Sequence, residues 1–129
     1  MASIVCKIIV YTNDVGFARR ISEIFSGDEY VLKTHDLFSE VVETLQKELY
    51  DVLIVETDFM GEMNGLLKIA DNILLGIPII VAVGENSFRV ENGNNSKFYF
   101  INKFASDEEW KNVVWLAVIE NYIITSREN

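Results

Sequence analysis

The apolar residues of this chain fall into five short runs rich in Val, Ile, Phe and Tyr, and polar residues, glycine or proline separate these runs. Runs of this length predict β-strands. Those that are apolar throughout are typical of strands buried on both faces of a parallel sheet. The predicted strands are Ile4–Tyr11, Tyr30–Thr34, Val52–Val55, Ile79–Val83 and Phe98–Ile101.

Between these strands, apolar residues recur at helical spacing and predict amphipathic helices. The last helix begins after Ser106, which has Glu109 three residues on, as in a capping box. The segment 84–96 differs, because its two glycines and four asparagines favour a loop where a fourth helix would stand. The predicted helices cover residues 15–25, 38–49, 65–75 and 107–124.

Alternating strands and helices predict an α/β domain, with a parallel sheet covered by helices on both faces. In such sheets, ligands and chemistry gather where the strands end at their carboxyl edge. The third strand ends in Glu56, Thr57 and Asp58, and the first is followed by Thr12, Asn13 and Asp14. These polar residues are the candidates for a functional site.

Length, composition and charge narrow the class of protein. The 129 residues, half of them apolar, predict one domain over 1–129. A net charge of -9 argues against electrostatic binding to nucleic acid or to an anionic membrane. The single cysteine, Cys6, is expected to pack in the first strand and excludes an intramolecular disulfide. No leader segment or membrane-spanning run is recognised, so we expect a cytoplasmic protein.

Several common site motifs are missing. The sequence has no Gly-x-Gly-x-x-Gly and no Gly-Lys-Ser/Thr loop, which argues against dinucleotide and P-loop sites. The single histidine, His35, has neither a cysteine nor a second histidine to share a metal with, and we expect it on the surface or in a turn.

Three local motifs point to a family. Lys103-Phe104-Ala105-Ser106 follows the fifth strand, Asp51 to Glu56 encloses four apolar residues, and Met63-Asn64-Gly65 comes soon after. With the order of elements, these motifs resemble the receiver domain of two-component response regulators from about Lys7 to Ile124. The resemblance implies a flavodoxin-like (βα)5 three-layer sandwich with strand order 2-1-3-4-5, here with an eroded fourth helix.

The resemblance also implies a site. In receivers, an acidic pair after the first strand and an aspartate ending the third strand bind Mg²⁺, and this aspartate accepts a phosphoryl group. A Ser or Thr ends the fourth strand, and a lysine that follows the fifth strand contacts the phosphate. Lys103 matches that lysine, and Phe100 matches the family's switch aromatic.

Other positions depart from the family pattern. Glu56 stands at the acceptor position, although an ungapped count back from Gly65 gives Thr57, and Asp58 is a third candidate. The acidic pair becomes Asn13 and Asp14, or Thr12 and Asn13 in another alignment. Val83 replaces the hydroxyl residue, and Gly61 replaces a loop proline.

These departures favour a degenerate receiver without aspartyl phosphorylation or enzymatic activity, in which Glu56 pairs permanently with Lys103. The simpler alternative is that these residues are merely solvated at strand ends. A second alternative is a phospho-accepting receiver that uses Asp58 or another carboxylate near Glu56 together with Mg²⁺, for which Asp14, Glu56 and Asp58 are the candidate ligands. A third is a small-molecule binder of the flavodoxin-like class, whereas the favoured hypothesis needs no cofactor.

The last helix is apolar on two sides. One stripe is expected to pack on the sheet, and the other predicts a surface for a protein partner, an output domain or a second copy of the chain. The alternative is packing beneath the segment 84–96. The predicted partner surface consists of Trp115, Leu116, Ile119, Tyr122 and Ile123.

Overall fold

The computed structural model of the protein describes residues 5–56, 77–84 and 98–127, the last five as backbone only. Its core is a five-stranded sheet in the order β2-β1-β3-β4-β5, in which every neighbouring pair is parallel. The predicted sheet and its strand order are therefore confirmed. The elements are β1 Cys6–Tyr11, α1 Val15–Ile24, β2 Tyr30–His35, α2 Phe38–Lys47, β3 Val52–Glu56, β4 Ile79–Val83, β5 Phe98–Asn102 and α4 Asp107–Arg127.

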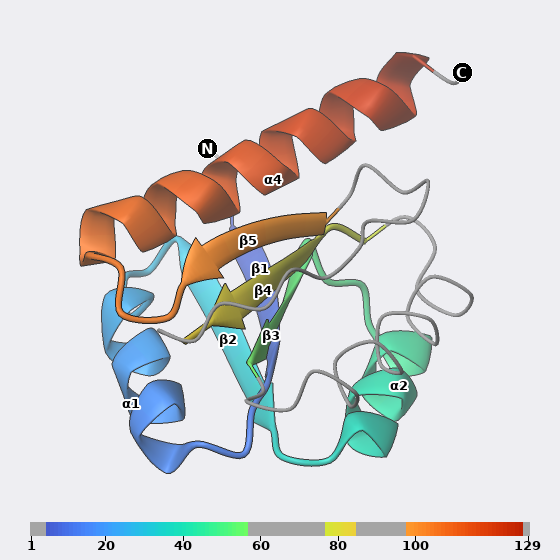
Figure 1. The fold of residues 1–129 in the computed structure, drawn as a ribbon. Coiled ribbons are helices and arrows are strands. Elements are labelled where there is room, and N and C mark those ends of the chain that lie inside the picture. The colour runs from blue at the N-terminus through green and yellow to red at the C-terminus, as the bar shows by residue number, and fades with distance from the viewer. Residues whose placement is uncertain (1–4, 57–76, 85–97, 128–129) are drawn as a thin grey trace.

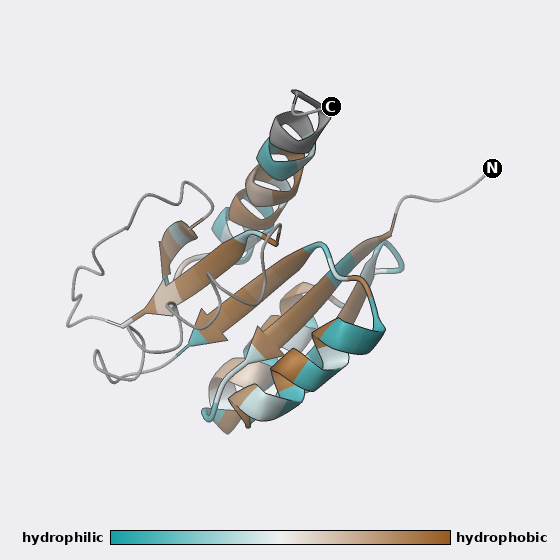
Figure 2. Ribbon diagram, turned by 90° about the vertical axis from the view of Figure 1, so that its right-hand side faces the viewer, coloured by the Kyte–Doolittle hydropathy of each residue, from teal (hydrophilic) through white to brown (hydrophobic). Residues whose placement is uncertain are grey.

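The helices form two layers around the sheet (Figure 1). Alternate residues of a strand face opposite sides, so Ile54 packs in the cluster that α1 and α4 cover, while its neighbour Leu53 packs in the cluster that contains Val41 of α2. Figure 2 shows the strands as the most apolar part of the chain. Burial on both faces explains why the inner strands β1, β3 and β4 have nearly continuous apolar runs instead of a polar–apolar alternation.

Side-chain caps fix where α1 and α4 begin. The Asp14 carboxylate accepts a hydrogen bond from the amide of Phe17 at 3.2 Å, and the Ser106 hydroxyl accepts one from the amide of Glu109 at 3.2 Å. The N-cap predicted at Ser106 is therefore confirmed. Caps of this type satisfy amides that the first turn of a helix leaves without partners.

Three details differ from the sequence-based expectation. Leu49 is exposed because α2 ends at Lys47, and the buried residues of that helix are Val41 and Thr44. His35 is not a turn residue: it ends β2, and its Nε2 lies 2.9 Å from the Thr44 hydroxyl. Glu56 continues β3 instead of following it.

The helix expected over 65–75 and the loop expected over 85–96 lie outside the described residues. The eroded fourth helix inferred from that loop therefore stays a prediction. Within the described part of the chain, no helix is long and apolar enough to cross a membrane. Cys6 lies buried in β1 as expected, and burial, assisted by the charge of Asp51, raises the pKa of its thiol to about 12.

The double-sided burial of β3 predicts a large difference between two aliphatic substitutions. Ile54 is fully buried at the centre of the sheet, so Ile54→Ala should lower the free energy of unfolding by about 2–5 kcal/mol. Val31→Ala, on the edge strand β2 and 44% exposed, should cost less than about 1 kcal/mol. Urea unfolding followed by circular dichroism measures both, and equal losses would contradict the burial described here.

Candidate functional site

Glu56 is the centre of the candidate site. It is the last residue of β3 and faces the same side of the sheet as Val52 and Ile54, toward α1 and α4. Its side chain is only 3% exposed. A buried carboxylate is costly unless hydrogen bonds or an opposite charge compensate for the lost water. The neighbouring strand ends supply both.

Thr12 provides the first compensating contact. Its hydroxyl donates a hydrogen bond to Oε1 of Glu56 at 2.7 Å and accepts one from the backbone amide of Asp14 at 3.0 Å. Thr12 is itself buried. Because β1 and β3 are adjacent in the sheet, the residue that follows β1 reaches the end of β3 directly. This contact fixes one oxygen of the carboxylate.

Lys103 provides the opposite charge. Its Nζ atom lies 3.4 Å from Oε2 of Glu56 and 3.4 Å from Oδ2 of Asp14, and its side chain is 12% exposed. The Glu56–Lys103 ion pair expected from the sequence is thus present in the structure. One ammonium faces two carboxylates, so the three groups carry one net negative charge. Because the side chains of Glu56 and Lys103 are both largely buried, the simpler alternative, in which the site residues are solvated at strand ends, does not hold for these two.

Asp14 has two tasks in the same site. One carboxylate oxygen caps α1 through the amide of Phe17, and the other faces Lys103. The Phe17 hydrogen bond and, to a smaller extent, the Lys103 ammonium hold the pKa of the Asp14 carboxyl below its ordinary value of 3.8. Asp14 is 43% exposed, so it forms the solvent side of the cluster.

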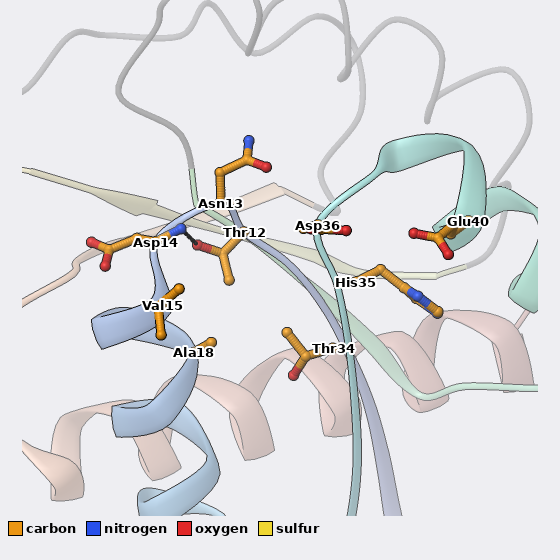
Figure 3. Close-up of a pocket in the computed structure, with 9 residues that line it drawn as sticks. All are labelled: Thr12, Asn13, Asp14, Val15, Ala18, Thr34, His35, Asp36 and Glu40. Carbon is orange, nitrogen blue, oxygen red and sulfur yellow. Dashed lines mark hydrogen bonds between the residues drawn. The ribbon is translucent and has the colours of Figure 1, made fainter.

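Other predicted site residues lie apart from this cluster. Asn13 is exposed, and Figure 3 shows its side chain pointing away from the carboxylate of Asp14. Phe100 lies on the edge strand β5 and is partly exposed. Thr57 and Asp58 lie outside the described residues, so the alternative acceptor registers stay predictions.

Val83, at the position where the resemblance implies a Ser or Thr, faces the other side of the sheet from Glu56. It packs with Ile79 and Val81 in the cluster on the α2 face, whereas Ala82 pairs with Glu56 in register. Strand alternation is the reason, since a side chain one position along the strand points to the opposite face. The hydroxyl is nevertheless missing from the site, because Ala82 and Gly84 flank Val83 in the sequence.

Of the three candidate Mg²⁺ ligands, Asp14 and Glu56 are described and Asp58 lies outside the described residues. Mg²⁺ is bound by oxygen ligands, typically one or two carboxylates together with waters. Here the carboxylates of Glu56 and Asp14 already share the Lys103 ammonium. Among residues 5–56, 77–84 and 98–127, no group of three or more His, Cys, Asp and Glu side chains could hold a metal ion.

A separate pocket of about 400 Å³ opens beside the cluster, between the turns that follow β1 and β2 (Figure 3). Several of its side chains are acidic, including Asp36 and Glu40, and Asp14 lies at its border. An acidic wall of this kind disfavours phosphate and other anions. The pocket is lined by Thr12, Asn13, Asp14, Val15, Ala18, Thr34, His35, Asp36 and Glu40.

Arg20 is a site residue that sequence reasoning missed. Its guanidinium donates to the backbone carbonyls of Lys103 and Ala105, and so holds the loop that carries the site lysine. The sequence signal was weak, since Arg20 lies one turn after Phe17 on the inner side of α1. The contacts of Arg20 require α1 to lie next to the β5–α4 loop, and only the fold shows that these two segments are neighbours.

The apolar surface of α4 is smaller than predicted. Trp115 is not freely exposed: its indole nitrogen donates to the Tyr30 hydroxyl at 2.9 Å, and its ring packs against the buried core. Trp115 reaches past the helix to β2 because it is the largest side chain on that side. Leu116, Ile119 and Tyr122 remain exposed by 50%, 53% and 74%. The side chain of Ile123 lies outside the described residues.

Several solved structures with this fold are signal receiver domains. The signal receiver domain of an HD domain-containing protein from Pseudomonas fluorescens superposes with a TM-score of 0.82 and 14% identity, covering 98% of this chain and 96% of that one. The N-terminal domain of a three-domain response regulator, sensory box and GGDEF protein from Carboxydothermus hydrogenoformans gives 0.71 and 14%, covering 92% and 98%. This chain therefore has the fold of response-regulator receiver domains.

The same fold also occurs in a different setting. A segment that makes up 17% of the lysine decarboxylase of Francisella novicida matches 91% of this chain, with a TM-score of 0.65 and 18% identity. No protein-family model and no curated protein matches the sequence. At these identities the likeness is one of fold, so function has to be argued from the site.

The lowered pKa of Asp14 predicts a pH-dependent contribution to stability. The Asp14 carboxyl has a lower pKa in the folded state, so it stabilises the fold above its ordinary value of 3.8 and loses this effect as pH falls through the folded-state value. Asp14→Asn keeps a good N-cap but removes the charge. The variant should be less stable than the wild type at pH 7 by less than about 1 kcal/mol.

Urea unfolding of both proteins between pH 7 and pH 2 measures this effect. The difference in free energy of unfolding should stay constant down to about pH 5 and shrink toward zero in stronger acid. A difference that does not change over the whole range would show that the charge of Asp14 has no part in it.

Proposed function

We propose that this protein is a receiver-like signalling module that acts through protein–protein contacts, without aspartyl phosphorylation and without enzymatic activity. The observation that carries the proposal is the position of Lys103, whose ammonium lies 3.4 Å from both Glu56 and Asp14. In this arrangement the lysine is already engaged by the protein's own carboxylates. The buried thiol of Cys6 fits the cytosolic location that we propose with it.

The groups that phosphoryl transfer needs are either replaced or already engaged by other side chains. Transfer depends on a metal and a cation that neutralise the charge developing on the phosphoryl oxygens. The cation is paired, and Glu56 is longer than aspartate by one methylene, so its carboxylate is displaced from the attack position. A misplacement of about 1 Å can lower a rate by about a hundredfold. The Glu56 oxygen nearest Thr12 is also engaged, as a hydrogen-bond acceptor.

In place of a phosphorylation cycle, we propose that the buried Glu56–Lys103 ion pair holds the site permanently in one conformation. In receivers the conserved lysine contacts the phosphoryl group, and here the Glu56 carboxylate presents a negative charge to Lys103. The charge is internal and does not depend on a kinase or on Mg²⁺. A module of this kind would signal through its abundance or its partners instead of a phosphorylation cycle.

We further propose that the exposed apolar surface of α4, formed by Leu116, Ile119 and Tyr122, binds a protein partner, an output domain or a second copy of the chain. Exposed apolar patches that remain after a core has formed often mark interaction sites. Two similar structures come from proteins whose names include further domains, an HD domain in one and sensory box and GGDEF domains in the other. The net charge of -9 disfavours nucleic acid as the partner.

Intact-mass spectrometry tests the proposed loss of phosphorylation. The wild-type protein is incubated with Mg²⁺ and a small-molecule phosphodonor, beside a conventional receiver domain as the positive control. We expect the control to gain the mass of one phosphoryl group and this protein to gain none. A stable adduct on the wild type would overturn the proposal, and its loss in Glu56→Gln or in Asp58→Asn would identify the acceptor.

Sedimentation velocity tests the α4 surface as a contact between two copies. If the chain self-associates there, its sedimentation coefficient should rise with concentration, and Ile119→Glu should abolish the rise by placing a charge in the interface. Val15→Glu, on the exposed side of α1, is the matched control and should behave as wild type. A wild type that is monomeric at every concentration rules out the homodimer and leaves a different protein as the partner.

A further inference from the structure

The loop between β5 and α4 carries Lys103 and depends on a residue from a distant part of the chain. Arg20 donates from Nη1 to the carbonyl oxygen of Lys103 at 2.8 Å and from Nη2 to the carbonyl oxygen of Ala105. The same guanidinium lies 3.6 Å from Oδ1 of Asp107, the first residue of α4. One side chain of α1 therefore contacts two residues of this short loop and the first residue of α4.

These carbonyls need a partner from outside the loop. Lys103 and Ala105 lie between the end of β5 and the start of α4, and the carbonyls of both accept a hydrogen bond from Arg20. The guanidinium of arginine is planar and carries several donors in a fixed fork, which suits two carbonyl oxygens at once. Lysine has a single ammonium and cannot reproduce this geometry.

The amides of the loop are held from the other side. The amide of Lys103 donates to the carbonyl of Val83 at 2.8 Å. Asn102 accepts the amide of Phe104 through its side chain at 2.8 Å and the amide of Ala105 through its backbone at 2.9 Å. Amides are thus held by β4 and β5, and carbonyls by α1. Arg20 connects the loop to α1, which lies on the other side of the site from β4 and β5.

We propose that Arg20 is a positioning residue, which fixes the β5–α4 loop so that Lys103 stays paired with Glu56 and Asp14. The flexible four-carbon side chain of Lys103 loses conformational freedom when it is held in a site that is nearly closed to solvent. If the backbone of the loop is already fixed, less conformational entropy is lost when the side chain of Lys103 is held in the site. This deepens the proposed function, because it explains how a site without a phosphoryl group keeps one arrangement.

The arrangement also links the site to α4. Arg20 lies near Asp107, and Phe17, one turn earlier on α1, packs against Trp110 with ring centroids 5.7 Å apart. The beginning of α4 is therefore fastened to α1 by an ionic contact and by an aromatic contact. A displacement of the loop that carries Lys103 would break the ionic contact between Arg20 and Asp107 and disturb the ring contact between Phe17 and Trp110.

Amide hydrogen exchange and a stability cycle test this role in the whole protein. Arg20→Gln removes the charge and the fork, Arg20→Lys keeps the charge alone, and Arg19→Gln changes the exposed neighbouring arginine. Hydrogen bonds to charged groups contribute about 1.5–3 kcal/mol. Exchange at Phe104 and Ala105 should therefore rise about tenfold or more in both Arg20 variants and stay unchanged in Arg19→Gln.

The second measurement follows Lys103 itself. The coupling between Lys103→Met and Glu56→Gln is measured from urea unfolding in the wild-type and Arg20→Gln backgrounds. We expect the coupling, expressed as an equilibrium constant, to be at least about threefold smaller in the Arg20→Gln background than in the wild-type background.

Three results would overturn the proposal: unchanged exchange in Arg20→Gln, wild-type exchange in Arg20→Lys, or raised exchange with unchanged coupling. None of these results depends on the phosphodonor experiment. A phosphoryl adduct on the wild-type protein would likewise refute the proposed function without touching the role of Arg20.

Discussion

The buried carboxylate of Glu56 is the constraint on which the site depends. A negative charge at the end of a fully buried strand loses most of its hydration, and the protein has to replace the lost water with its own groups. Thr12 supplies a hydrogen bond, Lys103 supplies a positive charge, and Asp14 shares that charge at the solvent edge. Two chain segments that are far apart in sequence, residues 12–14 and the loop with Lys103, therefore converge on the side chain of Glu56.

Buried ion pairs contribute little net stability, because desolvation offsets much of their attraction, but breaking one leaves a costly lone charge. Such a pair is therefore better suited to specifying one arrangement than to strengthening the fold. Here the arrangement extends beyond the pair. Arg20 holds the backbone carbonyls of Lys103 and Ala105, and Asp14 is both the cap of α1 and a neighbour of the lysine. The first helix and the last helix thus meet at the same site.

The last helix is fastened along its length and still leaves an apolar surface. Its middle is tied to β2 by the Trp115–Tyr30 hydrogen bond and to β5 by a hydrogen bond from the Tyr99 hydroxyl to Glu120 at 2.9 Å. Burial and the contact with Glu120 raise the pKa of Tyr99 to about 12, so this hydroxyl remains a donor at neutral pH. Leu116 and Ile119 lie between these attachments and face away from the core, where a partner could reach them.

The sequence by itself determined the class of fold. Continuous apolar strands, helical periodicity between them and the cap at Ser106 all follow from local chemistry, and the strand order followed from the family resemblance. Sequence also brought Glu56 and Lys103 together as a predicted pair. The resemblance put Val83 at the position of the missing hydroxyl, and its side chain faces the α2 side of the sheet because alternate strand residues point to opposite faces.

Only the tertiary structure decided which residues surround Glu56. The roles of Thr12 and Arg20 depend on β1 lying beside β3 and on α1 lying beside the β5–α4 loop, and no local pattern encodes such proximity. The same holds for Trp115, whose apolar position on the helix suggested exposure, while the reach of its ring to Tyr30 buries much of it. Local periodicity specifies which side of an element is apolar, whereas the contacts of a side chain depend on how the elements pack.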